Sequence, residues 1–135
     1  MSTMHLILSA FCIGITNIFV EWFIIGVLFH KVQSLTPQTW RAENKSSYMY
    51  STALSFLFGA LFTFFYVKIG WHYVLRENIL SACKLGLICF GCFAFILESG
   101  NAIYINYDRK FMAGKMISLC ITYLSAAIIA CLFNG

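Results

Sequence analysis

The chain has 135 residues, of which 61% are hydrophobic and 10% are charged, and its formal net charge is +4. Soluble domains have about 45–50% apolar and about 25% charged residues, so this composition excludes an ordinary soluble domain and predicts a protein embedded in the lipid bilayer. The basic residues lie mainly at the ends of apolar segments, and no basic patch with interleaved aromatics occurs elsewhere, which excludes a nucleic-acid partner.

Four apolar segments reach the length of about 20 residues that a transmembrane helix needs. They cover residues 6–30, 46–69, 79–105 and 112–133. We expect the first to be retained as a helix, because no Lys or Arg precedes Lys31 and a secretory signal needs a basic start. The third link is very short and predicts an antiparallel hairpin of the last two helices. The sequence therefore predicts an all-α, integral membrane four-helix bundle that forms a single domain, 1–135.

Basic residues are distributed unevenly between the two sides of this bundle. Links one and three with their flanks hold Lys31, Arg41, Lys45, Arg109, Lys110 and Lys115, whereas the opposite side holds Lys68, Arg76 and Lys84. Cytoplasmic loops carry the excess of Lys and Arg. We therefore expect a multi-pass protein of a bacterial-type inner membrane with both termini outside.

In the first span, Glu21 is the only charged residue between Leu6 and Phe29. An ionisable side chain in hydrocarbon costs about 2.5–3.5 kcal/mol on insertion scales, so it usually faces the bundle interior and marks function. One helical face carries, at steps of four, three and four, Ala10, Gly14, Asn17 and Glu21.

The second and fourth spans carry stripes of small residues at steps of four. They are Ser47, Ser51, Ser55, Gly59 and Thr63 in the second, and Gly114, Ser118, Thr122, Ala126 and Ala130 in the fourth. Membrane helices associate through close contact of small residues, so both stripes predict helix packing. The partner of each stripe lies either within the chain or in another subunit.

The third span repeats the pattern of the first. Its charge-free run from Leu85 to Tyr107 is interrupted only by Glu98, and one face carries Gly91, Ala94, Glu98 and Asn101. Since both spans run in the same direction and each glutamate lies past the midpoint, the two carboxyl groups are expected at similar depth. This pattern suggests two pseudo-repeated helical hairpins, as in some transporters.

Two interpretations of the acidic residues stay open. In the functional one, Glu21 and Glu98 approach each other beside Asn17 and Asn101 and share a proton, because two close carboxylates cannot both ionise cheaply. Such a pair relays protons or binds a cation, within a polar layer that Ser55, Cys120 and Thr122 complete. In the structural one, each glutamate is protonated or hydrogen-bonded to a neighbour and fixes helix register.

The remaining chemical motifs indicate structure rather than catalysis. Cys89 and Cys92 form a C-x-x-C inside the third span, but no loop holds a second redox pair and a mid-membrane thiol ionises poorly. The histidines are scattered and no Cys/His cluster has metal-ligand spacing. No phosphate-binding loop or nucleophile motif occurs. We predict a protein without catalytic residues, metal or cofactor.

A series of aromatic and basic residues marks the end of the first span and the link after it. It runs Trp22-Phe23, Gly26, Phe29-His30-Lys31 and Trp40. In this order the first half of the chain resembles a family of small bacterial four-span membrane proteins of unknown function. The link differs in length, and the proline usual after the aromatic pair is absent. The resemblance implies a four-helix bundle and no assigned activity.

Two functions from different classes fit these features. The first is an accessory or scaffold subunit that acts through helix packing, as a homo-oligomer or within a larger membrane complex. Small size, short loops and the small-residue stripes favour it. The second is a compact proton- or cation-linked carrier or channel that uses Glu21 and Glu98.

Overall fold

The computed structural model describes residues 2–39, 44–70 and 78–134, and in these ranges it contains helices and no strand. Four helical stretches are long and apolar enough to cross a membrane, Thr3–Leu28, Lys45–Ile69, Ile79–Tyr104 and Arg109–Asn134. The predicted all-α four-helix bundle is thus confirmed, and the chain is a multi-pass membrane protein. Two sets of residues lie outside the described ranges, Trp40 and residues 71–77 of the second link. Trp40 carries part of the resemblance given above.

The first half of the chain forms one long helix, two short ones and a second long helix. Helix α1 (Thr3–Glu21) continues directly into the π-helical segment η1 (Trp22–Leu28), and the short α2 (His30–Gln33) and η2 (Pro37–Thr39) follow. Helix α3 (Lys45–Phe65) continues into a second π-helical segment, η3 (Tyr66–Gly70). Each long helix starts at a side-chain cap, Ser2 for α1 and Asn44 for α3, because these side chains accept hydrogen bonds from otherwise unpaired backbone N–H groups.

The second half forms an antiparallel hairpin. Its first arm consists of α5 (Ile79–Cys89), the π-helical segment η4 (Phe90–Phe95) and α6 (Ile96–Tyr104), and its second arm is α7 (Arg109–Asn134). The Asp108 carboxylate accepts a hydrogen bond from the Lys110 N–H at 2.8 Å and so caps the start of α7.

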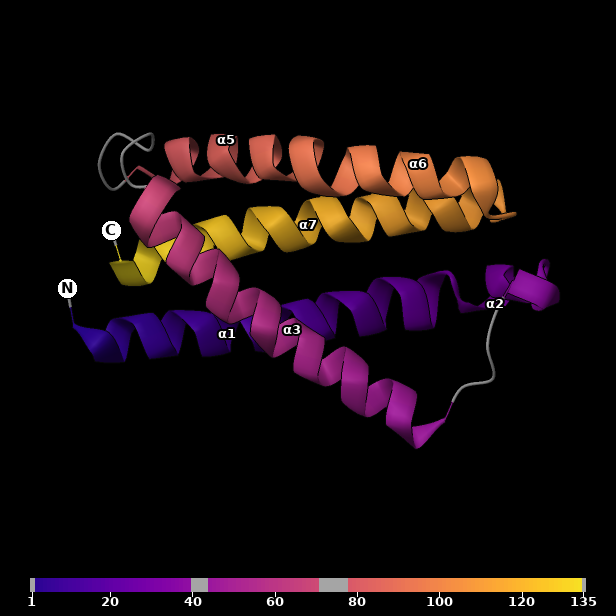
Figure 1. Cartoon of the computed structure of the whole chain (residues 1–135), viewed down its shortest axis with the longest axis horizontal. Coiled ribbons are helices and arrows are strands. Elements are labelled where there is room, and N and C mark those ends of the chain that lie inside the picture. Colours follow the sequence, from indigo (N-terminus) through magenta and orange to yellow (C-terminus); the bar gives the residue numbers. More distant parts are fainter. Residues whose placement is uncertain (1, 40–43, 71–77, 135) are drawn as a thin grey trace.

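Helix α7 lies between α1 and the α5–α6 arm and contacts both (Figure 1). Helix α3 crosses α1 obliquely, whereas the α5–α6 arm and α7 run side by side (Figure 1). The two hairpins therefore differ in packing geometry. Both chain ends lie at the same end of the bundle, as an even number of spans requires.

The crossing of α3 over α1 depends on glycines. A Cβ atom on Gly59 would overlap the Ala10 carbonyl oxygen and lie 2.9 Å from the Gly14 backbone nitrogen. A Cβ atom on Gly14 would lie 2.6 Å from the Phe56 ring. Contact of the two backbones at this distance is the way in which membrane helices associate, since lipid supplies no hydrophobic drive between them.

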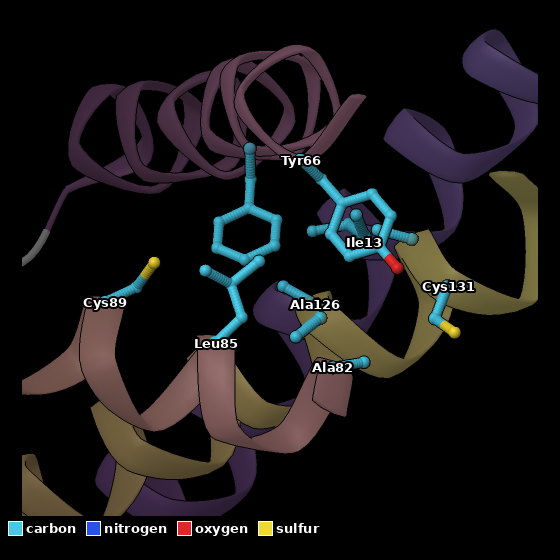
Figure 2. Packing of buried hydrophobic residues seen from close by; sticks show 10 residues of the cluster. Ile13, Tyr66, Ala82, Leu85, Cys89, Ala126 and Cys131 are labelled. Atoms are coloured by element: carbon cyan, nitrogen blue, oxygen red, sulfur yellow. The ribbon is translucent and has the colours of Figure 1, made fainter. Parts of the chain in front are cut away.

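An apolar cluster fills the half of the bundle that contains the chain ends (Figure 2). Tyr66 is fully buried at its centre, and its hydroxyl lies beside Cys131 (Figure 2). The cluster draws on all four long helices, through Ile13, Phe62, Tyr66, Ala82, Leu85, Cys89, Ala126, Ala127, Ala130 and Cys131. Gly86 allows α5 to approach α7 closely, because its Cβ would lie 2.9 Å from the Tyr123 carbonyl oxygen. Apolar side chains thus fill most of this half of the bundle.

Candidate functional site

A buried polar layer joins three of the four spans at Asn17. The Asn17 amide Nδ2 donates to Ser55 Oγ at 3.1 Å, and its Oδ1 accepts from Thr122 Oγ1 at 3.0 Å. Ser55 Oγ in turn donates to the Ser51 carbonyl oxygen at 3.1 Å. Asn17, Ser55 and Thr122 therefore form one hydrogen-bonded chain across α1, α3 and α7, of which Cys120 is not a member.

A second polar contact lies deeper between α1 and α3. The hydroxyls of Ser9 and Thr63 lie 3.2 Å apart and both side chains are buried. Ser9 precedes Asn17 by eight residues, with Ile13 midway, so spacing at steps of four predicts a shared face. The sequence pattern predicted Ala10 on this face, and Ser9 was not predicted there.

Glu98 forms an ion pair. Its Oε2 lies 2.7 Å from Lys115 Nζ, and the exposed fractions are 15% for the Glu98 side chain and 28% for that of Lys115. The same ammonium group lies 5.3 Å from the centroid of the Tyr107 ring, a cation–π distance. Glu98 and Tyr107, which belong to the same hairpin as Lys115, therefore both contact its ammonium group.

Glu21 has a different environment. Its side chain is partly buried, and within the described ranges no side chain forms a hydrogen bond or an ion pair with its carboxylate. Lys115 is near enough to interact with it electrostatically. The sequence interpretation in which Glu21 and Glu98 approach each other and share a proton differs from this arrangement, because α7 stands between their helices and supplies a lysine partner to Glu98.

The three charged groups lie at the same level of the bundle. Glu21 is seven residues before the end of its span, Glu98 is six before the end of its span, and Lys115 is six after the start of the antiparallel fourth span. At 1.5 Å per residue, each lies about 10 Å inside the ends of the spans. The 26-residue spans are about 39 Å long against a hydrocarbon thickness of about 30 Å, so this level is just inside the hydrocarbon region.

An open cleft of about 720 Å³ leads to Glu21. Residues of α1, η1, α2, α3 and α7 form its walls, and those of α3 belong to its first turns. These turns diverge from α1 (Figure 1). Polar groups on the walls come from Glu21, His30, Gln33, Ser51, Thr52, Lys115 and Ser118. A second hollow, of about 410 Å³, has Glu21 in its wall as well and extends to Asn17, Ser55 and Thr122. Glu21 therefore lines both the open cleft and the hollow that extends to the polar layer.

The stripes of small residues face partners within this chain. Ser55, Gly59 and Thr63 are buried against α1, whereas Ser51 is exposed at the cleft. The stripe of α7 is buried along its length, at Gly114, Ser118, Thr122 and Ala126. Gly114 faces the ring of Phe29, which a Cβ atom would overlap. The stripe of α7 and the part of the α3 stripe from Ser55 to Thr63 are therefore occupied inside the bundle, whereas Ser47 and Ser51 are exposed.

The remaining candidates lie apart from the cleft. Asn101 is partly buried on α6, three residues beyond Glu98. Cys89 and Cys92 are both free thiols, the first buried and the second exposed on η4.

No family model, curated protein or solved structure compared with this chain matches it. Its function therefore has to be inferred from the geometry of the site.

Proposed function

We propose that this protein is a compact proton- or cation-linked carrier in which Glu21 is the carboxylate that exchanges a proton for a cation. The observation that carries the proposal is the open cleft leading to a membrane-level carboxylate that no described side chain pairs with. A carboxylate in this position is costly to keep, so it marks a binding or transport site by default.

The neighbouring charges favour a cation as the exchanged species. Lys115 is the positive group nearest to this level, and the Glu98 carboxylate at 2.7 Å neutralises it. Glu21 then leaves the group of three with a net charge of about −1 when all are ionised, which attracts a cation and repels an anion. Glu98 acts in this proposal as the ion-pair partner that neutralises Lys115, rather than as a second binding carboxylate.

Access to the site comes from one side. The cleft opens toward the links after the first and third spans, and the apolar cluster fills the opposite half. The excess of Lys and Arg at these links supports a cytoplasmic opening and both termini outside, in a bacterial-type inner membrane. In this proposal the structure represents the state of the carrier that is open to the cytoplasm.

Carbodiimide labelling tests the role of Glu21 without knowledge of the substrate. Dicyclohexylcarbodiimide reacts with protonated carboxyl groups in apolar surroundings, so it is expected to modify Glu21 and to spare ion-paired Glu98, as read by peptide mass spectrometry. Equal labelling of both carboxyl groups, or labelling of Glu98 alone, contradicts the proposal.

Flux in proteoliposomes tests the coupling itself. With a pH-sensitive dye inside and Na⁺, K⁺ or tetraphenylphosphonium added outside, wild-type protein is expected to release protons in response to at least one cation. Glu21→Gln should abolish this response while circular dichroism and assembly stay unchanged. A response that survives Glu21→Gln ends the carrier proposal.

A second candidate, the accessory or scaffold subunit, is favoured by one further observation. All side chains from Asn44 to Leu54 are exposed, including Met49 at 64% and Tyr50 at 72%, along the turns of α3 that stand away from α1. A helix of a second copy or of another membrane protein would cover this surface. Because the stripe containing Gly59 is already occupied within the chain, this exposed surface is the better place for an interface.

Purification in mild detergent separates the two candidates. An accessory subunit should be recovered as a reproducible homo-oligomer or complex, and Ala53→Trp on the exposed turns should disrupt it. Ala60→Trp is the matched control, since Ala60 is also exposed on α3 but lies in the part of the helix that packs on α1, outside the turns that stand away from it. A strictly monomeric protein with no bound partner counts against the accessory role.

A further inference from the structure

The walls of the cleft combine one unpaired carboxylate with several aromatic rings. Trp22, Tyr48 and Phe111 line it from η1, α3 and α7, and Ile18 and Leu119 add aliphatic surface. The faces of such rings attract cations, most strongly when water is excluded. The cleft therefore offers a charge partner and an apolar surface to the same ligand.

The size of the cleft fits an organic molecule rather than a single inorganic ion. Its volume of about 720 Å³ falls within the range of about 300–1,000 Å³ that small-molecule sites occupy. Sites of this kind are lined mainly by apolar and aromatic groups, with a few polar groups that fix orientation. Ser51, Thr52 and Ser118 supply hydroxyls of this kind.

The Glu98–Lys115 ion pair of the second hairpin determines which sign of charge the ligand must carry. Lys115 also lines the cleft and on its own would favour an anion. Glu98 and the Tyr107 ring hold its ammonium group, so the charge that remains at the ligand site is that of Glu21. His30 also lines the cleft.

We propose that the cleft binds an amphipathic organic cation, with the positive group of the ligand at Glu21 and its apolar body against Trp22 and Tyr48. This inference rests on the proposed cation-linked function and narrows its substrate class. An aromatic ammonium or phosphonium compound has the chemistry that the site recognises. Because the cleft is open beside exposed Trp22, such a ligand reaches it from the interface of the membrane.

Binding of tetraphenylphosphonium to the purified protein tests the inference, with equilibrium dialysis as the measurement. Glu21→Gln is expected to raise the dissociation constant at least about tenfold, since it removes the charge partner. Trp22→Ala should raise it by about two- to thirtyfold, the range of a cation–π contact. Phe64→Ala is the matched aromatic control, because Phe64 is 62% exposed and does not line the cleft, and it should leave binding unchanged.

A comparison of probes separates failure of this inference from failure of the proposed function. Tetramethylammonium carries the charge without the aromatic body and is expected to bind at least about tenfold more weakly than tetraphenylphosphonium. Tetraphenylphosphonium should also protect Glu21 from carbodiimide. If Na⁺ or K⁺ protects Glu21 and tetraphenylphosphonium does not, the organic substrate class is wrong and the carrier proposal stands. If no cation protects it, or if Glu21→Gln binds tetraphenylphosphonium as wild type does, both are overturned.

Discussion

Substitution of Gly59 by alanine is the most direct test of how α1 and α3 meet. The new Cβ atom would overlap the Ala10 carbonyl oxygen and lie 2.9 Å from the Gly14 nitrogen, and both atoms belong to the backbone of α1. No side-chain rotation relieves such contacts, so the helices must separate. Gly100→Ala is the control, because nothing lies within 4 Å of a Cβ atom at that position.

The expected magnitude follows from three terms. Inserting a methyl group into a packed contact costs about 1–3 kcal/mol. Separation also weakens the Ser9–Thr63 and Asn17–Ser55 hydrogen bonds, each worth about 0.6 kcal/mol in a membrane. Replacing a helical glycine by alanine returns up to about 1 kcal/mol. We expect a net loss of about 1–3 kcal/mol for Gly59→Ala and a gain of up to about 1 kcal/mol for Gly100→Ala.

Unfolding in mixed micelles measures both variants. The purified proteins are titrated with sodium dodecyl sulfate, and far-UV circular dichroism follows the transition and gives the free energy of unfolding. The free energy of unfolding is expected to fall in Gly59→Ala and to rise in Gly100→Ala, so the two variants are distinguished by the sign of the change. A Gly59→Ala protein as stable as wild type would refute the close backbone contact, and an equal loss in Gly100→Ala would mean that alanine is harmful for reasons unrelated to the crossing.

Two further predictions concern the second hairpin. Glu98→Gln should free Lys115 to pair with Glu21 and so reduce carbodiimide labelling of Glu21. The double variant Glu98→Gln with Lys115→Gln should restore the labelling. Equal labelling in the single and double variants would disprove this link. In variants that retain a single cysteine, pyrene maleimide in native membranes should label Cys92, which is exposed, faster than Cys89, which is buried; equal rates would mean that η4 is turned differently.

The fold follows from the sequence because length and hydropathy alone specify a spanning helix. In the first span, for example, the prediction of residues 6–30 lies close to the observed Thr3–Leu28. The π-helical segments were not foreseen, since their backbone hydrogen bonds leave no compositional sign in a run such as Phe90–Phe95. The order of helices in space was not predicted either. Hydropathy ranks faces but does not say that α7 separates α1 from α6.

The site was predicted in its parts but not in its pairing. Steps of three and four placed Asn17, Ser55 and Thr122 on inner faces, and the structure joins them by hydrogen bonds. Lys115 was counted with the basic flank that sets orientation, although it lies inside the predicted span of residues 112–133. It also precedes Ser118 by three residues and Thr122 by seven, which puts it on the face of the stripe. That spacing was the signal for a lysine directed toward a carboxylate.

In the π-helical segment η4, substitutions and single-codon deletions should differ in their effect on the protein. Three of the six residues of η4 are exposed and only Ala94 is buried, so exchanges among apolar amino acids at the exposed positions should be mild. Loss of a single codon is different, because it changes the number of residues between α5 and Glu98 and so displaces the Glu98 carboxylate from Lys115. Natural variants of this segment should therefore be rich in replacements and poor in insertions and deletions, since selection acts there on the number of residues more than on their kind.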